Sequence, residues 1–246
     1  MPKFIGVIQA RMSSTRLPGK LLGPVAGRPL IAVLFDRVRD ARVDEWWMAT
    51  TDERTDDVTA AWGVAMGLEV FRGDREDVLS RFAEIAVLRR PDWIVRLTAD
   101  NPFVDAGIID ALVGGAETAA QTIQHVGEGH ARQLPLGFVP EVVRGDAIIT
   151  LNRLDLPAHD RAHVTSRIRE GPASQAAAID PSWPRRPAWR WTVDTPADLA
   201  MADAAFRAFG STGASIDYRG MVARLDACPE ITAMNADVRQ KDVVHG

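Results

Sequence analysis

The sequence contains one cysteine, one tyrosine and no long apolar run among its 246 residues. A lone cysteine, Cys228, excludes an internal disulfide and agrees with a reducing compartment. No stretch of about 18 consecutive apolar residues occurs, so we expect no membrane-spanning helix. The apolar run that begins near Met1 is too short for a signal peptide. These absences make the cytoplasm the expected location and a membrane partner unexpected.

Lysine is also scarce. The sequence has three lysines, at positions 3, 20 and 241, but 26 arginines. Lys20 is therefore present either by chance or because arginine cannot replace lysine at this position. The formal net charge is −4, whereas nucleic-acid-binding domains usually carry a basic balance. We expect no nucleic-acid partner, although a local basic pocket for a polyanion is compatible with this charge.

The first 120 residues alternate short apolar runs with longer amphipathic ones. This rhythm predicts a mostly parallel sheet covered by helices on both faces, and the length suits a single α/β domain. The expected strands are residues 4–8, 46–50, 68–71 and 93–97, and the expected helices are residues 29–39, 56–66, 77–88 and 105–120.

After about residue 121 the rhythm loosens. We expect strands at 122–126, 173–179 and 189–193, and helices at 145–154 and 159–170. A further helix is expected from Pro196, with Thr195 as its cap. The polar residues after Asn235 predict a frayed tail.

The loop after the first strand, residues 9–20, carries Arg11, Arg16 and Lys20. Ligands of open parallel sheets lie beyond the carboxyl ends of the strands. Three cations there suit a triphosphate, because arginine offers a planar fork to phosphate oxygens and lysine a compact charge. The alternative is a solvated basic loop. The spacing is neither that of a P-loop nor that of a dinucleotide-binding fingerprint.

The segment IQARMSSTRLPGK, residues 8–20, closely resembles the opening signature of the spore coat polysaccharide biosynthesis type of cytidylyltransferase. This family is related to the CMP-N-acetylneuraminate and CMP-KDO synthetases. Four later segments resemble the family in the same order: RGDREDVLSRF (72–82), VRLTADNPFVD (95–105), AHVTSRIR (162–169) and WTVDTPADL (191–199).

The resemblance implies a single-domain Rossmann-like fold of the nucleotide-diphospho-sugar transferase type, with a mixed, mostly parallel sheet. It implies an enzyme that transfers CMP from CTP to a small acceptor with release of pyrophosphate. It also implies a magnesium cofactor on Asp100 and Asp194, each just past an expected strand. From the residues alone, the favoured readings are a turn former before Pro102 for Asp100 and a helix cap for Asp194. Asp105 and Asp198 fit better as structural residues at helix starts.

The resemblance assigns nucleotide binding to the residues that follow the strands. Of these we expect Lys20, Arg11 and Arg16 to be catalytic. A polar turn is an equal reading for Thr51 and Asp52, and a structural ion pair for Arg81. The full nucleotide-binding set is Gln9, Ala10, Arg11, Ser13, Arg16, Lys20, Thr51, Asp52, Arg81, Thr98 and Asp100.

The acceptor half departs from the family pattern. Val139 replaces the aspartate of a G-x-D-x-E segment whose glutamate remains as Glu141, and Ala162 replaces the glutamate of R-E-H-V-T. We expect acceptor contacts from Glu141, His163 and Arg132, although a structural histidine and an exposed loop arginine are the simpler readings. The expected acceptor is a sugar acid, a phosphosugar or a related acidic compound.

The resemblance divides the single domain into a nucleotide half (1–120), an acceptor and dimerisation region (121–190), a closing metal segment (191–234) and a tail (235–246). We expect a homodimer. Two alternatives stay open at this point. One is a glycosyltransferase of the same fold, although its usual D-x-D motif is absent from the sequence. The other is a catalytically silent nucleotide-binding paralogue.

Overall fold

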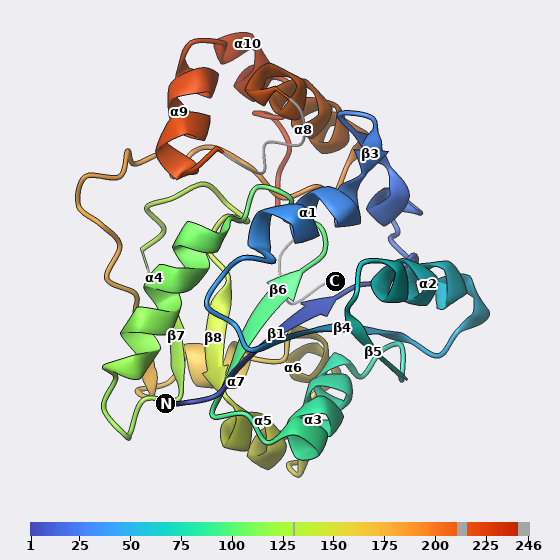
Figure 1. The fold of residues 1–246 in the computed structure, drawn as a ribbon, viewed down its shortest axis with the longest axis vertical. Coiled ribbons are helices and arrows are strands. Elements are labelled where there is room, and N and C mark those ends of the chain that lie inside the picture. The colour runs from blue at the N-terminus through green and yellow to red at the C-terminus, as the bar shows by residue number, and fades with distance from the viewer. Residues whose placement is uncertain (130, 211–215, 241–246) are drawn as a thin grey trace.

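A seven-stranded sheet forms the centre of the computed structural model, which describes residues 1–129, 131–210 and 216–240. Its strand order is β5-β4-β1-β6-β8-β7-β9, and the block β5-β4-β1-β6 is parallel (Figure 1). β8 runs antiparallel to β6 and to β7, which makes the sheet mixed. The strands are β1 (Phe4–Gln9), β4 (Glu45–Thr51), β5 (Glu69–Gly73), β6 (Trp93–Thr98), β7 (His125–Gly127), β8 (Glu141–Arg144) and β9 (Ser174–Ala176), and β2 (Pro24–Val25) with β3 (Arg28–Pro29) forms a separate hairpin.

Helices cover both faces of this sheet, which is why the central strands are apolar on both sides. Along β1, Phe4 and Ile8 pack in one core cluster, while Ile5 and Val7 pack in the other. The first cluster includes residues of α1, α4, α8 and α9, and the second includes residues of α3, α5 and α7. The helices are α1 (Leu30–Val38), α2 (Asp57–Ala65), α3 (Val78–Arg89), α4 (Ala106–Glu117), α5 (Gly145–Asn152), α6 (Ala158–His163), α7 (Ser166–Arg169), α8 (Pro196–Phe209), α9 (Tyr218–Asp226) and α10 (Pro229–Ala233), with 3₁₀ turns η1 (Lys20–Leu22) and η2 (Arg54–Asp56).

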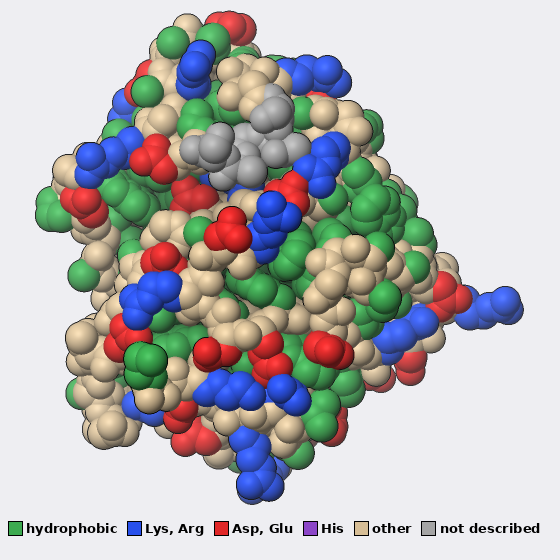
Figure 2. Space-filling model, viewed as in Figure 1, with side chains coloured by type: hydrophobic (Ala, Val, Ile, Leu, Met, Phe, Trp, Pro, Cys, Tyr) green, Lys and Arg blue, Asp and Glu red, His purple; other side chains and the backbone are tan. Residues whose placement is uncertain are grey.

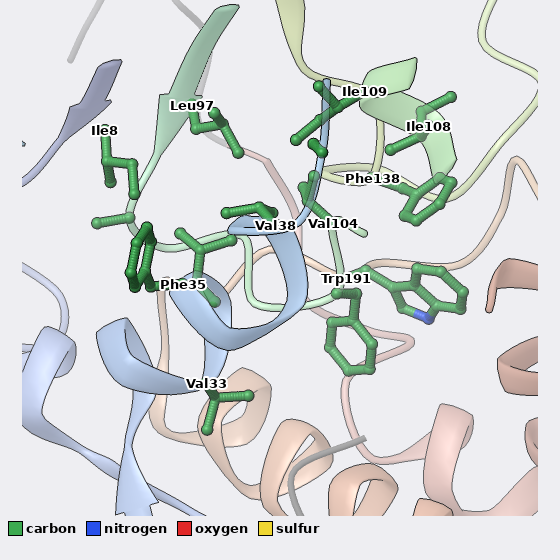
Figure 3. Packing of buried hydrophobic residues seen from close by; sticks show 14 of the residues in the cluster. Ile8, Val33, Phe35, Val38, Leu97, Val104, Ile108, Ile109, Phe138 and Trp191 are labelled. Atoms are coloured by element: carbon green, nitrogen blue, oxygen red, sulfur yellow. The ribbon is translucent and has the colours of Figure 1, made fainter. Parts of the chain in front are cut away.

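Aromatic rings of α8 and α9, Phe206 and Tyr218, pack on Phe103 and Trp191, which lie outside the strands. In Figure 3, Phe138 and Trp191 lie together beside Val104, away from the strand residues Ile8 and Leu97. The Trp191 ring is fully buried and stacks on Phe103, with ring centroids 4.9 Å apart. This packing fixes the backbone immediately before Asp194.

The expected single α/β domain with a mostly parallel, mixed sheet is confirmed, and so are the first four strands and helices within a few residues at their ends. The expected Thr195 cap is present as a reciprocal capping box with Asp198. The expected strand at 189–193 is wrong, because this segment makes one isolated bridge, between Leu136 and Arg190. The expected helix at 159–170 is two helices, broken at Val164 where φ is 62°.

Charges of both signs are interspersed on the face drawn in Figure 2, where no single basic surface dominates. Among the described residues, no helix is long and apolar enough to cross a membrane. The Asn235 side chain, next to the expected tail, is buried and hydrogen-bonded. The rest of the expected tail from residue 241 lies outside the described residues.

Candidate active site

The carboxyl ends of β1 and β6 and the segment before α8 meet at one edge of the sheet. β1 and β6 are parallel neighbours, and Gln9 pairs with Thr98 at the last position of their register. The Val193 N–H donates to the Asp100 carbonyl at 2.8 Å, which ties the later segment to the end of β6. Asp194 therefore lies near Asp100, although an extended segment delivers it rather than a strand.

Lys20 joins these two aspartates. It begins η1, directly after Gly19, whose φ of 72° belongs to the left-handed region that glycine adopts without strain. The Lys20 ammonium donates to Asp100 Oδ2 at 2.7 Å, to the Val193 carbonyl at 2.8 Å and to Asp194 Oδ1 at 2.9 Å. These bonds use all three ammonium donors. Lys20 is 9% exposed, so its ion pairs with the two aspartates are buried and do not lie on the surface.

The surroundings of this cluster keep its charges ionised. Burial alone lowers the pKa of the Lys20 ammonium, but Asp100 and Asp194 raise it, and the result is a pKa above the ordinary value. Burial alone raises the pKa of the Asp194 carboxyl, but Lys20, Arg16 and Arg190 lower it, and the result is a pKa below the usual value. Lysine and carboxylate are therefore both charged at neutral pH.

A second layer of side chains holds Asp194 in place. Its Oδ2 accepts from Arg190 at 2.7 Å and lies 3.1 Å from the Arg16 guanidinium. The buried Arg190 also donates to Asp198 Oδ1 at 2.9 Å. Asn235 donates to both the Arg190 carbonyl, at 3.0 Å, and Asp198 Oδ1, at 2.9 Å. Asp198 is thus structural, as expected, and the carboxyl-terminal segment reaches the site.

The donor set fits a hard divalent cation. Asp100 and Asp194 already share one cation, the Lys20 ammonium, so their carboxylates are placed to hold positive charge between them. Magnesium takes one or two carboxylates and fills its shell with phosphate oxygens and water. The Asp100 side chain is 24% exposed, which leaves a side open to ligand. Within the described parts of the chain, no group of three or more His, Cys, Asp or Glu is arranged to hold a metal.

Asp56 fixes the loop of residues 9–20, which we call the phosphate loop after the role expected for it. Its Oδ1 accepts from the Met12 N–H at 2.7 Å, and the Met12 carbonyl accepts from the Gly19 N–H at 3.1 Å. Arg11 projects from this loop with a side chain that is 42% exposed. Among the described residues its guanidinium makes a long hydrogen bond of 3.4 Å to the Arg75 carbonyl and a loose ion pair, at 3.9 Å, with the exposed Glu76. Arg11 is therefore free to turn toward an anion.

Two of the expected nucleotide residues meet at the end of β4. The Ala49 carbonyl accepts from the Ala10 N–H at 3.1 Å and from Arg81 at 3.2 Å. Arg81 is buried, and burial, together with the nearby Arg11, lowers the pKa of its guanidinium. The buried hydroxyl of Ser13 has no hydrogen-bond partner within the described chain. The Arg81 guanidinium therefore makes a structural hydrogen bond, to the backbone of β4.

The other expected residues differ in exposure. Thr51 is fully buried and its hydroxyl donates to Asp56, so Thr51 helps to position the carboxylate that holds residues 9–20. Asp52, next to it, is exposed. The Thr98 hydroxyl accepts from Asn101 Nδ2 at 2.7 Å, and Asn101 Oδ1 is buried without a partner among the described residues.

Glu141 is held by a network and not presented as a free carboxylate. It accepts from Arg96, from the Thr165 hydroxyl at 2.7 Å and, at 3.3 Å, contacts His125 Nε2. Burial alone raises the pKa of the Glu141 carboxyl, but Arg96, His125 and Thr165 lower it well below its usual range. Arg96 also donates twice to Gln9 Oε1, at 3.0 and 3.2 Å, so the network reaches the phosphate loop.

A cavity of about 330 Å³ lies beside Thr98, and Arg96, His125 and Glu141 form part of its lining. Arg169 on its wall is 3.7 Å from Glu141 and 44% exposed. His163 is half buried, and burial followed by Arg96 and Arg169 lowers its pKa. The expected Arg132 lies elsewhere, donating to the Pro187 carbonyl at 3.0 and 3.2 Å. The cavity is lined by Arg96, Leu97, Thr98, Asn101, Val104, His125, Glu128, Gly129, Val139, Pro140, Glu141 and Arg169.

The sequence reasoning missed Arg96, Asp56 and Asn235 as parts of the site. Arg96 interrupts an apolar run, VRL, inside a strand expected to be buried on both faces, and that is a readable signal for a paired charge. The roles of Asp56 and Asn235 depend on partners 44 and 37 to 45 residues away.

Residues 5–199 match the family described as Cytidylyltransferase. The chain belongs to the cytidylyltransferase family. The spore coat polysaccharide biosynthesis protein SpsF of Bacillus subtilis is 36% identical to it over 218 residues, 85% of this chain and 89% of that protein. A 3-deoxy-manno-octulosonate cytidylyltransferase of Anaeromyxobacter dehalogenans is 33% identical over 162 residues, 63% of this chain and 65% of that protein. The expected family and nucleotidyltransferase class are confirmed.

Solved structures share the fold of this cytidylyltransferase. A cytidylyltransferase from Leptospira borgpetersenii has a TM-score of 0.87 at 25% identity and covers 98% of this chain and 100% of its own. A CMP:2-keto-3-deoxy-manno-octonic acid synthetase complexed with CTP has a TM-score of 0.61 at 21% identity, with coverage of 83% and 98%. Rv0371c of Mycobacterium tuberculosis, in complex with manganese, has a TM-score of 0.55 at 20% identity, with coverage of 80% and 95%. These neighbours confirm the expected fold type.

Proposed function

We propose that this cytidylyltransferase transfers CMP from CTP to a small acidic acceptor and releases pyrophosphate, in the synthesis of a cell-surface glycan or a related compound. One observation carries the proposal: a buried lysine at the end of the phosphate loop contacts two carboxylates at the carboxyl edge of the sheet. The relatives SpsF and 3-deoxy-manno-octulosonate cytidylyltransferase support the choice of CTP and of a sugar-like acceptor.

The chemistry is a substitution at phosphorus. An acceptor oxygen forms a bond to the α-phosphorus of CTP, and the bond from that phosphorus to the oxygen bridging to the β-phosphate breaks. Pyrophosphate leaves with the electron pair, and the proton of an attacking hydroxyl passes to solvent. Lys20, Arg11 and Arg16 hold the triphosphate and neutralise the charge that grows on the leaving pyrophosphate.

Asp100 and Asp194 are the residues that would hold magnesium. The bound ion would supply positive charge shared by phosphate and acceptor oxygens. Arg190 keeps the Asp194 carboxylate oriented, and Asp198 and Asn235 keep Arg190 in place. The manganese complex of Rv0371c supports a divalent cation on this fold.

The cavity beside Thr98 is the proposed acceptor site. Arg169 offers a partly exposed guanidinium to an acidic group, and Val139 replaces a family carboxylate with an apolar wall. Glu141 would act there through Arg96 and Thr165, since its oxygens are already hydrogen-bonded. We further propose the division of the chain given above, with residues 121–190 forming the acceptor and dimer region of a cytoplasmic homodimer.

The test is pyrophosphate release, measured with each of the four ribonucleoside triphosphates and a panel of acidic sugars, phosphosugars and phosphonates. The proposal expects release that requires both CTP and an acceptor. Absence of triphosphate binding overturns it. Transfer from a nucleotide sugar indicates the glycosyltransferase alternative, and CTP binding without product across the panel indicates a silent paralogue.

Variants assign the residues. Lys20→Ala is expected to lose most turnover while the protein stays folded, and Asp100→Asn to abolish magnesium-dependent product formation. Lys3→Ala is the matched control, because Lys3 pairs with Glu45, donates to the Arg89 carbonyl and belongs to no part of the site. Unchanged turnover in Lys20→Ala, or unchanged metal dependence in Asp100→Asn, removes that residue from its role.

A further inference from the structure

The Lys20 ammonium stands in the position that a shared divalent cation would need. It lies 2.7 Å from Asp100 Oδ2 and 2.9 Å from Asp194 Oδ1, so one positive centre bridges the two carboxylates. A magnesium ion bridging the same pair would sit about 2.0–2.1 Å from each oxygen. An ammonium and a divalent cation cannot share that space, because both are positive and lie within contact distance of the same oxygens.

The lysine is also held by a third acceptor, outside the pair of carboxylates. Its third bond goes to the Val193 carbonyl at 2.8 Å, on the backbone that Trp191 packing fixes. Its side chain is 10% exposed, and no water need enter to satisfy it. In this position all three N–H groups of the Lys20 ammonium are hydrogen-bonded. Moving the ammonium away therefore requires another anion that attracts it as strongly as the two carboxylates do.

A triphosphate is such an anion. Lys20 ends the phosphate loop, on a flexible four-carbon stem, and phosphate oxygens attract an ammonium as strongly as carboxylates do. We propose that Lys20 is the resident counter-cation of the metal site, so that the site accepts a divalent cation only together with a nucleoside triphosphate, whose phosphates draw the lysine away from Asp100 and Asp194. This inference rests on the proposed function for the identity of that triphosphate.

Binding order follows from this arrangement. A site whose binding-competent state is a small fraction of the population binds its ligand more weakly by that fraction. A lysine seated in about 99 of every 100 molecules would weaken metal binding about a hundredfold in the nucleotide-free enzyme. The enzyme then discriminates for the metal–triphosphate complex and against the free ion.

The experiment measures Mn²⁺ affinity by electron paramagnetic resonance and titration calorimetry on the full-length protein without nucleotide. Lys20→Met keeps an unbranched side chain of similar length but vacates the charged position. We expect it to bind Mn²⁺ about a hundredfold more tightly than the wild type, and the double variant Lys20→Met/Asp194→Asn to lose that gain. We also expect Mn²⁺ to raise the melting temperature of Lys20→Met but not that of the wild type. This shift is a second measure of Mn²⁺ binding, because a ligand that binds the folded protein stabilises it.

Arg16→Met is the matched control for charge alone. Arg16 contacts the other oxygen of Asp194 at 3.1 Å from a side chain that is 26% exposed, so its loss removes one nearby charge without opening the bridging position. We expect its Mn²⁺ affinity to stay within about fivefold of the wild type, as for a partly exposed ion pair.

Two results overturn the inference: equal Mn²⁺ affinity in wild type and Lys20→Met, or an equal gain in Arg16→Met. Neither touches the proposed function, which is read separately from CTP-dependent pyrophosphate release by the wild type. In the other direction, a wild type that releases no pyrophosphate refutes the proposed function, while the nucleotide-free Mn²⁺ comparison still decides the role of Lys20.

Discussion

Replacing Glu141 by glutamine should destabilise the protein strongly, because Glu141 compensates a buried arginine. The Glu141 and Arg96 side chains are 14% and 11% exposed. Removing one partner of a buried ion pair costs about 3–5 kcal/mol, since the remaining charge stays buried and uncompensated. Glutamine keeps the shape and one acceptor oxygen, so we expect the lower end, about 3 kcal/mol. At about 2–4 °C per kcal/mol for a chain of this size, the melting temperature falls by about 6–12 °C.

Urea unfolding at pH 7 measures this difference in the free energy of unfolding. Glu117→Gln is the control, because Glu117 pairs with Arg42 at the surface, where side chains are 31% and 53% exposed. An exposed pair contributes about 0–1 kcal/mol. A loss in Glu141→Gln no larger than that in Glu117→Gln would refute the idea that the Arg96 charge depends on Glu141.

The same difference should depend on pH in a defined direction. The pKa of Glu141 is lowered in the folded protein, so its contribution is complete above the unfolded pKa of about 4.3 and is lost as the pH falls toward the folded pKa. The gap in stability between wild type and Glu141→Gln should therefore be present at about pH 5 and shrink as the pH falls below about 4.3. A gap that widens as the pH falls below about 4.3 contradicts the assignment.

Three further substitutions probe other parts of the structure. Gly137→Ala should destabilise by about 1–3 kcal/mol and lower activity, because φ is 89° and a Cβ would lie 2.7 Å from Asn101 Oδ1; unchanged unfolding and kinetics would speak against a close fit there. Ala26→Asn should stabilise by up to about 1 kcal/mol in thermal unfolding, since φ is 49° in the two-residue β2–β3 turn; a loss of stability would contradict this. Asn235→Ala should weaken magnesium binding about tenfold in a magnesium titration of turnover, because Arg190 loses its support, and an unaltered titration would show that the support is dispensable.

The parallel half of the fold was readable from the sequence because its signals are local. Apolar runs such as residues 4–8 bury both faces, and amphipathic helices follow each run at regular spacing. The positions just after those strands then located Lys20 and Asp100 without structural information. Position in the sequence also indicated Thr195 as a helix cap, because capping is decided within one helical turn.

The elements that failed depend on distant partners. In residues 189–193, Trp189, Trp191 and Val193 alternate with polar residues, which is the pattern of a strand. The segment is extended, but its hydrogen bonds go to Leu136 and Asp100 and not to a neighbouring strand. No local pattern reveals which backbone an extended segment will meet. The short strand β8 was missed for the same reason, since pairing with β6 and β7 defines it.

The span of the Lys20 cluster has a consequence for how the enzyme is made. Lys20 meets Asp194 across 174 residues, and Arg190 is supported by Asn235 near the other end of the chain. During synthesis the phosphate loop leaves the ribosome long before the residues that complete its surroundings. A chain that ends before residue 194 carries Lys20 without one of its two carboxylate partners. The complete cluster, with Arg190 held by Asn235, therefore forms only after residue 235 has left the ribosome.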